Sequence, residues 1–177
     1  MITLRGEKIY LRAVEPEDAA FIFDVENDET LWELSHTQTP FSKHTIQQYV
    51  QNAHKDIFEV KQLRLIIEAE KNKPLGMIDL FDFDFKNKRA GVGILIKNNK
   101  NRQQGFGTEA LHLLIQYSFN KLDLHQLYCN IAEDNEQSLK LFQNAGFQKV
   151  GLKKDWNYSN GTFTNEYLLQ LVKNKCI

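Results

Sequence analysis

The chain has 177 residues, of which 42% are hydrophobic and 25% are charged, as in an ordinary globular protein with its own core. A net charge of −1 gives no overall basic field, so we expect neither nucleic acid nor a membrane as a partner. No stretch has the roughly 20 apolar residues of a membrane helix, and no signal peptide is evident at the start. We expect one soluble, cytoplasmic domain over residues 1–177.

The chain contains two cysteines, Cys129 and Cys176, and they do not have the spacing of a metal site. So few cysteines in a chain of this size are typical of a reduced, cytosolic protein. We expect Cys129 to be a small buried side chain in a strand, and we expect no metal.

The first half of the sequence predicts two helices between strands. Residues 9–13 alternate apolar and polar side chains as a strand does. Pro16 and the acids after it suit the first turn of a helix, and Ser42 is a suitable N-cap for a second helix. Three β-rich runs with short turns then predict an antiparallel meander, at residues 63–70, 75–85 and 90–96.

The second half alternates helices and strands. Apolar residues at helical spacing predict a long helix over 105–122. A short buried strand at 127–131 and a helix over 137–145 follow, and Gly146 suits the position just after that helix. The chain then continues as a strand from residue 147 to 150, turns at Asn160-Gly161 and ends with a strand at 162–171. This order predicts an α/β fold with a mixed sheet.

A loop with two glycines lies before the long helix and reads Arg102-Gln103-Gln104-Gly105-Phe106-Gly107, followed by Thr108. Glycines let a ligand approach the backbone, and the first turn of a helix offers N–H groups to an anion. The loop suits a pyrophosphate, with added charge from Arg102 and a hydroxyl from Thr108, but it also suits a plain helix start. It is neither a P-loop nor a dinucleotide-binding loop.

A second segment, Asn135-Glu136-Gln137-Ser138, opens the later helix, which ends at Gly146-Phe147. An Asn at such a position can be a simple cap or turn residue. The two segments, joined by a helix and a strand, are much more specific together than either is alone.

Together they resemble the GNAT superfamily of acetyl-CoA-dependent N-acetyltransferases. The family motif Q/R-x-x-G-x-G/A matches Arg102, Gly105 and Gly107, and the later pattern N-x-x-S-x-x-x-Y/F-x-x-x-G-F matches Asn135, Ser138, Phe142, Gly146 and Phe147. The resemblance covers nearly the whole chain and is strongest to the spermidine/diamine and ribosomal-protein N-terminal acetyltransferases. It implies an α/β (α+β) fold with a central mixed, mostly antiparallel sheet, flanked by helices and splayed between the fourth and fifth strands.

The resemblance also implies a donor site for acetyl-CoA as co-substrate. The pantetheine would pair with the backbone of Ile94, Leu95 and Ile96 in the fourth strand. The loop Arg102, Gln103, Gln104, Gly105, Phe106 and Gly107, with Thr108, would hold the pyrophosphate. Asn135 would donate a hydrogen bond to the pantetheine, and Ser138 and Phe142 would line the same site.

The sequence departs from the family at two chemical positions. Polyamine acetyltransferases have a tyrosine acid where this chain has Phe142, and some relatives have a glutamate base near the position of Gly91. Neither role carries over. Direct attack by a neutral amine would still be assisted by proximity and by a backbone N–H that stabilises the oxyanion.

On the acceptor side, Asp82 matches an acidic polyamine-binding position, where it would bind an ammonium or relay its proton; a solvated strand end is the other interpretation. Alternation places Asp79 and Asp82 on opposite faces. Tyr128 and Ser138 are fallback acids, and Glu33 and His36 lie in the loop expected to shape the acceptor site.

The sequence leaves two readings of function open. The first is an N-acetyltransferase for a primary amine, namely a polyamine or diamine, another small amine, an amino sugar or a peptide N-terminus. The alternative is a noncatalytic acyl-CoA-binding or sensing module, which Phe142 favours. A nucleotide-binding domain is rejected because its lysine and Mg²⁺-ligand motifs are missing. Family members are often dimers, so a homodimer is open.

Overall fold

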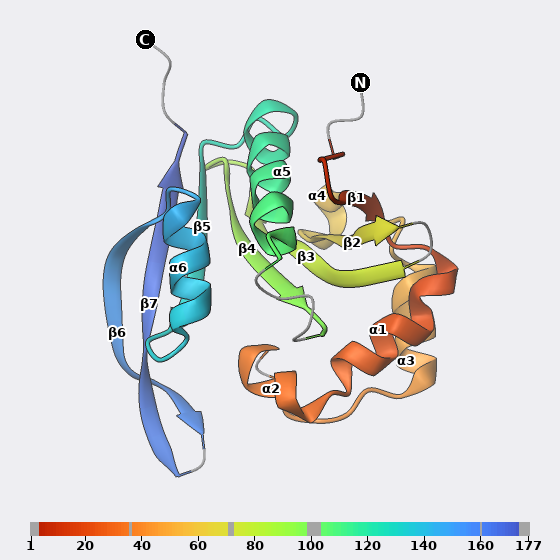
Figure 1. Cartoon of the computed structure of the whole chain (residues 1–177), viewed down its shortest axis with the longest axis horizontal. Coiled ribbons are helices and arrows are strands. Elements are labelled where there is room, and N and C mark those ends of the chain that lie inside the picture. The colour runs from red at the N-terminus through yellow and green to blue at the C-terminus, as the bar shows by residue number, and fades with distance from the viewer. Residues whose placement is uncertain (1–3, 36, 71–72, 99–103, 160, 174–177) are drawn as a thin grey trace.

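A computed structural model describes residues 4–35, 37–70, 73–98, 104–159 and 161–173. One seven-stranded sheet organises the chain, with the strand order β1-β2-β3-β4-β5-β7-β6 (Figure 1). The strands are β1 (Tyr10–Ala13), β2 (Leu63–Glu70), β3 (Lys73–Asp84), β4 (Arg89–Ile96), β5 (Gln126–Ala132), β6 (Gln148–Ser159) and β7 (Thr162–Val172). The helices are α1 (Ala19–Glu26), α2 (Glu29–Ser35), α3 (Lys43–Gln51), α4 (Ile57–Val60), α5 (Phe106–Asn120) and α6 (Glu136–Asn144), with a 3₁₀ turn at Pro16–Asp18 before α1.

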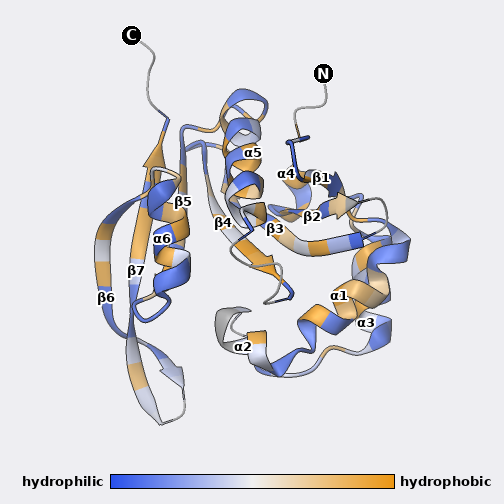
Figure 2. Ribbon diagram, in the orientation of Figure 1, coloured by the Kyte–Doolittle hydropathy of each residue, from blue (hydrophilic) through white to orange (hydrophobic). Residues whose placement is uncertain are grey.

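Helices cover both faces of the sheet, and the alternation of strand side chains divides the core accordingly. Leu65 and Ile67 of β2 point into the main core with α5 and α6, whereas Ile66 between them joins a second core with α1 and α3. Figure 2 shows hydrophobic and hydrophilic residues mixed along α5 and α6, as expected of helices with one buried side. The helices α1 and α3 therefore form one layer on one face of the sheet, and α5 and α6 form another layer on the opposite face.

The sheet opens between β4 and β5. These strands are parallel and pair only from Arg89 to Gly91 of β4, opposite Gln126 to Tyr128 of β5. All the other neighbouring strands are antiparallel. In the described part of the chain no strand pairs with the β5-facing edge of β4 from Val92 to Leu95. The prediction of a mostly antiparallel sheet splayed at this point is confirmed.

Several local predictions are also confirmed. Ser42 caps α3, since its hydroxyl accepts a hydrogen bond from the Thr45 N–H at 3.0 Å. Gly146 follows α6 with a φ of +98°, and Ser159 pairs with Thr162 across the Asn-Gly turn. Cys129 is buried in β5, as predicted.

Other elements differ from the prediction. The segment predicted as a loop after α1 forms the helix α2. Asp28, just before this helix, accepts a hydrogen bond from the Thr30 N–H at 3.0 Å. Strand β6 runs to Ser159 rather than ending at Val150. It is an exposed edge strand without a buried alternation, so its sequence carries no strong strand pattern.

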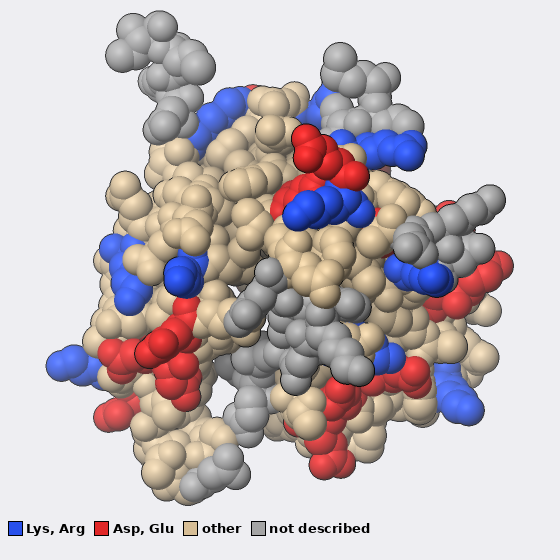
Figure 3. Space-filling view, in the orientation of Figure 1, with Lys and Arg blue, Asp and Glu red and all other residues tan. Residues whose placement is uncertain are grey.

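Surface charge is mixed in sign. Figure 3 shows acidic and basic side chains in small groups over the face presented there, in keeping with the net charge of −1. Within the described residues, no helix has the length and hydrophobicity to cross a membrane.

Candidate active site

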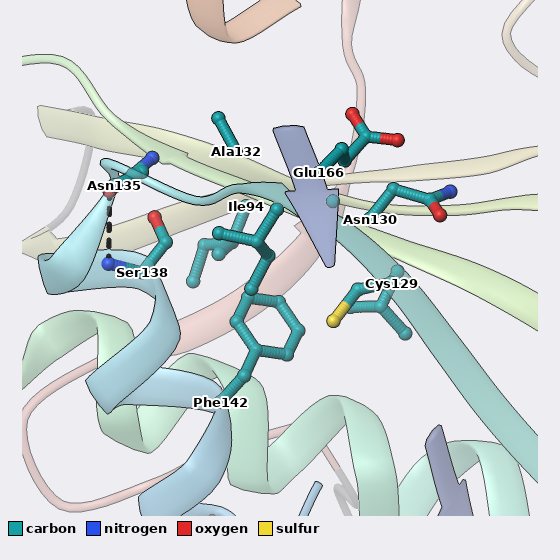
Figure 4. Close-up of a pocket in the computed structure, with 11 residues that line it drawn as sticks. Ile94, Cys129, Asn130, Ala132, Asn135, Ser138, Phe142 and Glu166 are labelled. Carbon is teal, nitrogen blue, oxygen red and sulfur yellow. Dashed lines mark hydrogen bonds between the residues drawn. The ribbon is translucent and has the colours of Figure 1, made fainter. Parts of the chain in front are cut away.

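A pocket fills the gap where β4 and β5 separate (Figure 4). Four elements form its walls: residues 92–94 of β4, residues 129–132 of β5, Asn135, Ser138 and Phe142 at α6, and Glu166 of β7. The structure thus brings together Ile94, Asn135, Ser138 and Phe142 from the predicted donor site. Leu95 lines a second pocket instead, and the side chain of Ile96 packs against the main core.

The N-terminus of α5 has no side-chain cap. Its N-cap is Gly105, with a φ of +86° in the left-handed region that favours glycine. Glycine has no side chain with which to cap a helix, so an anion is a suitable partner for the N–H groups of Phe106, Gly107 and Thr108. Arg102 and Gln103 of the predicted loop lie outside the described residues.

Lys8 is a neighbour of this loop that the sequence did not suggest. Its Nζ donates a hydrogen bond to the carbonyl of Gln104 at 3.2 Å. Its backbone N–H, like that of Glu7, donates to the carboxylate of Glu109 in the first turn of α5. Lys8 therefore places a positive charge beside Gly105. Only folding brings it there, because Lys8 and Gln104 are 96 residues apart in the sequence.

Asn135 is the N-cap of α6. Its Oδ1 accepts a hydrogen bond from the Ser138 N–H at 3.1 Å (Figure 4). The Nδ2 group points away from the helix (Figure 4), and Asn135 is among the residues that line the pocket. The cap therefore fixes the direction of that donor.

Phe142 and Cys129 form a wall that cannot exchange protons at neutral pH. Phe142 is 3% exposed and packs edge-on against Phe147, with 5.1 Å between the ring centroids. Burial raises the pKa of the Cys129 thiol well above its ordinary value, so the thiol stays protonated and is no nucleophile. Neither side chain supplies a proton acid for a leaving thiolate.

A second pocket, with a volume of about 410 Å³, lies on the α1 face of the sheet. It shares Val92, Gly93, Ile94 and Asn130 with the first pocket. The two pockets therefore meet at the edge of β4, one on each side, so groups bound in them would approach one another beside Gly93.

Three charged side chains line the second pocket, and we call them the Arg64 cluster: Glu26, Arg64 and Asp79. Arg64 Nε and Nη2 donate to the two oxygens of Asp79 at 2.8 and 2.9 Å, and Nη1 donates to Glu26 at 2.7 Å. Burial alone would lower the pKa of Arg64, but the charges of Asp79 and Glu26 outweigh burial and hold the pKa above its usual value. Arg64 is therefore a permanent cation.

Asp82 is not among the residues that line either pocket. It is exposed, has a φ of +49° and sits in the irregular end of β3 between Phe81 and Asp84. Its carboxylate accepts a hydrogen bond from the Tyr128 hydroxyl at 3.4 Å. Of the two aspartates considered from the sequence, Asp79 is the one in the pocket.

Asn130, at the junction of the pockets, belongs to a hydrogen-bond network with β6 and β7. Lys153 Nζ donates to Asn130 Oδ1 at 2.9 Å and also pairs with Glu166, whose side chain is 4% exposed. Asn157 Nδ2 donates to the other oxygen of Glu166 at 3.2 Å. The buried carboxylate is thus balanced by a lysine, and Asn130 is held in place.

The predicted acceptor loop is described only in part. Trp32 donates a hydrogen bond from its indole N–H to the Glu26 carbonyl at 2.9 Å, so it fastens α2 to the end of α1. His36 and the side chain of Glu33 lie outside the described residues. Across the described chain, no group of three His, Cys, Asp or Glu side chains is arranged to hold a metal.

The candidate site thus combines a splayed β4–β5 gap, a glycine-capped helix N-terminus and two pockets that meet at the strand edge. The family profile of the acetyltransferase (GNAT) domain matches residues 8–148. The chain therefore belongs to the GNAT family and is an acyltransferase.

Known proteins similar to this chain carry acetyltransferase names. The uncharacterized N-acetyltransferase p20 of Bacillus licheniformis is 29% identical over 98% of this chain and 97% of that protein. A spermidine N(1)-acetyltransferase of Vibrio cholerae serotype O1 is 22% identical over 96% of each. The spermidine N-acetyltransferase from Vibrio cholerae in complex with CoA and spermine has a TM-score of 0.85 to this structure, with 21% identity over 94% of this chain and 96% of that chain. The structural likeness establishes a shared fold.

Proposed function

We propose that the chain is a single-domain, acetyl-CoA-dependent N-acetyltransferase that transfers an acetyl group to a primary amine. One observation carries the proposal: the two pockets lie on opposite sides of β4 and share Val92, Gly93, Ile94 and Asn130. A donor in one pocket and an acceptor in the other would meet at that edge without a covalent enzyme intermediate. Residues 1–177 would form the whole acetyltransferase domain.

Acetyl-CoA, the acetyl donor, would bind in the β4–β5 gap. The backbone of residues 94–96 would pair with the amide groups of the pantetheine, since β5 has diverged from this edge. Asn135 would add its Nδ2 donor, with Ser138 and Phe142 beside it. The pyrophosphate would lie at the α5 N-terminus, on residues 102–108, with Lys8 as a further cation. The geometry of Gly105 and of the Asn135 cap supports this fit.

The proposed acetyl transfer releases one proton overall, and that proton comes from the amine acceptor. An alkylammonium loses one proton, and the neutral nitrogen attacks the thioester carbonyl. The carbon–sulfur bond breaks, an amide forms, and the thiolate takes up a proton, so the net products are amide, free thiol and one released proton. A β4 backbone N–H would stabilise the oxyanion during the attack. A thiolate leaves readily, which makes a tyrosine acid dispensable.

We propose a small amine, including a polyamine or diamine, or a peptide N-terminus as the acceptor. The names of the spermidine acetyltransferase relatives support an amine. The sparse cysteines support a cytoplasmic location, and we retain a homodimer, for which size-exclusion chromatography with light scattering is the test.

The decisive experiment incubates the protein with acetyl-CoA and a panel of polyamines, monoamines, peptides and amino sugars, and follows the release of free thiol. We expect thiol release with at least one amine class and a mass gain of one acetyl group on that amine. Tight CoA binding with no thiol release across the panel would instead support the noncatalytic acyl-CoA-binding module. Phe142 is the observation that favours this alternative, because it brings no proton donor to the gap.

A further inference from the structure

The second pocket has one polar end, and the structure assigns a ligand class to it. We propose that Glu26 and Asp79, held in place by Arg64, bind the ammonium group of the acceptor, and that the preferred acceptor is a primary alkylamine with one positive charge on an apolar stem. This inference rests on the proposed acetyltransferase function and narrows its substrate class.

The charge of the Arg64 cluster favours a single cation. Two carboxylates and one guanidinium leave one net negative charge. Both oxygens of Asp79 and one oxygen of Glu26 accept hydrogen bonds from Arg64. A carboxylate oxygen has room for more than one hydrogen bond, so an ammonium can be added without breaking the existing bonds. Arg64 thus acts as a positioning residue that keeps the carboxylates oriented.

The cluster lies beside the point of transfer. The sheet register places Arg64 opposite Asp79 and Asp79 opposite Gly93. Directly opposite residues on one face have Cβ atoms about 5 Å apart, so the Asp79 side chain is next to the strand edge where both pockets meet. At Gly93 an added Cβ would find its nearest neighbour, a Phe81 ring carbon, at 3.8 Å. Asp79 and Gly93 line the same pocket.

The remaining walls suit an uncharged stem. Apart from the cluster, the side chains in this pocket are mostly apolar, and they include Val25, Leu31, Met77 and Phe81. An apolar wall disfavours a second charge unless that charge has its own partner. Glu166 lines the first pocket and not this one, and it already pairs with Lys153. The pocket therefore offers one ammonium subsite in an apolar setting.

The test measures binding to the protein saturated with CoA, so it does not depend on turnover. Hexylamine, hexan-1-ol, 1,6-diaminohexane and 6-aminohexanoate are titrated by calorimetry. We expect hexylamine to bind at least about tenfold more tightly than hexan-1-ol and 6-aminohexanoate to bind more weakly than hexylamine. The diamine should bind more weakly than hexylamine despite its statistical advantage of about twofold, because its second ammonium would lie against the apolar wall without a partner.

Glu26→Gln removes the negative charge of this side chain, while the amide oxygen of the glutamine can still accept a hydrogen bond from Arg64. We expect on the order of tenfold weaker binding of hexylamine, with unchanged binding of hexan-1-ol and CoA. Asp24→Asn is the matched control: the same loss of charge on the same helix, at a residue that pairs with Lys97 at 3.3 Å outside the pocket. It should leave hexylamine binding unchanged.

Two results would overturn the inference: equal affinity of hexylamine for wild type and Glu26→Gln, or a diamine that binds the wild type as tightly as hexylamine or more tightly. The titrations of the four ligands into wild-type protein need no variant, so they still test the inference if Glu26→Gln does not fold. Glu26-dependent amine binding without thiol release would refute the acetyltransferase function alone, whereas thiol release with Glu26-independent binding would refute this inference alone.

Discussion

The ring of Phe81 occupies the space that a side chain at Gly91 would need. An ideal Cβ built on Gly91 would lie 2.3 Å from Cε2 of Phe81, far inside van der Waals contact. The same ring packs edge-on against Tyr128, with 6.1 Å between the centroids. A glutamate base at position 91 and a phenylalanine at position 81 are therefore mutually exclusive in this packing, which gives a structural reason for the missing base.

Gly91→Glu should destabilise the protein by about 1–3 kcal/mol, because it overpacks the contact with Phe81. Gly93→Ala is the matched control on the same face of β4, since its nearest neighbour would be at 3.8 Å, and it should change the free energy of unfolding much less. Adding Phe81→Ala to Gly91→Glu should recover part of the loss. Urea denaturation measures all three, and equal stabilities of Gly91→Glu and wild type would contradict the packing argument.

Much of the fold was predictable because its signals are local. The Ser42 cap, the Gly146 turn and the buried periodicity of α5 each depend on a few neighbouring residues. The β4–β5 splay was predicted only through the family resemblance, since no local pattern encodes where two parallel strands diverge.

The candidate site was less predictable where it depends on long-range packing. The sequence distinguished Asp79 and Asp82 by simple alternation. In the structure Asp82 lies in the irregular end of β3 and lines neither pocket, whereas Asp79 pairs with Arg64 and lines the second pocket. Glu26 and Lys8 reach the site from elements distant in sequence. Only the folded chain brings these charges together.

Gly105 should be required for CoA binding as well as for folding. Gly105→Leu forces a side chain into a left-handed backbone and beside Lys8, whose Nζ would lie 3.3 Å from the new Cβ. We expect a loss of about 1–2 kcal/mol in stability and at least tenfold weaker CoA binding by calorimetry. Gly161→Leu has a similar φ of +83° with nothing within 4 Å, so it should share the stability cost and keep CoA affinity. Equal CoA affinity of both variants would refute the loop assignment.

Asn135→Asp should separate the two uses of this side chain. The carboxylate can still accept from the Ser138 N–H and suits a helix N-terminus, so thermal stability should be kept. The Nδ2 donor is lost, and CoA should bind on the order of tenfold more weakly. Ser42→Ala, which removes the cap of α3, should cost about 1 kcal/mol of stability without affecting CoA. The assignment fails if Asn135→Asp retains full affinity.

The Cys129 thiol should resist modification in the native protein. Burial raises its pKa in the folded state, so its stabilising effect is fully present below the unfolded-state pKa of about 8.5. That contribution is lost as the pH rises above this value toward the raised folded-state pKa, because the unfolded chain then releases the proton more readily. In Cys176→Ser protein at pH 8, a thiol reagent should react with Cys129 only after denaturant is added. Rapid labelling of the native protein would contradict the burial of this thiol.

Phe142→Tyr tests whether the missing acid limits the reaction. The ring of Phe142 extends from α6 into the gap beside Ile94 and Cys129 (Figure 4), so a hydroxyl at its far end would enter the donor pocket. If protonation of the thiolate limits turnover, the variant should raise kcat at least about tenfold, since a positioned acid contributes about 10²–10⁴-fold, with CoA affinity unchanged. Phe147→Tyr, on the ring that packs against Phe142 at 5.1 Å, adds the same hydroxyl outside the pocket lining and should not raise kcat. An unchanged kcat in Phe142→Tyr would mean that amine attack, assisted by proximity alone, already sets the rate.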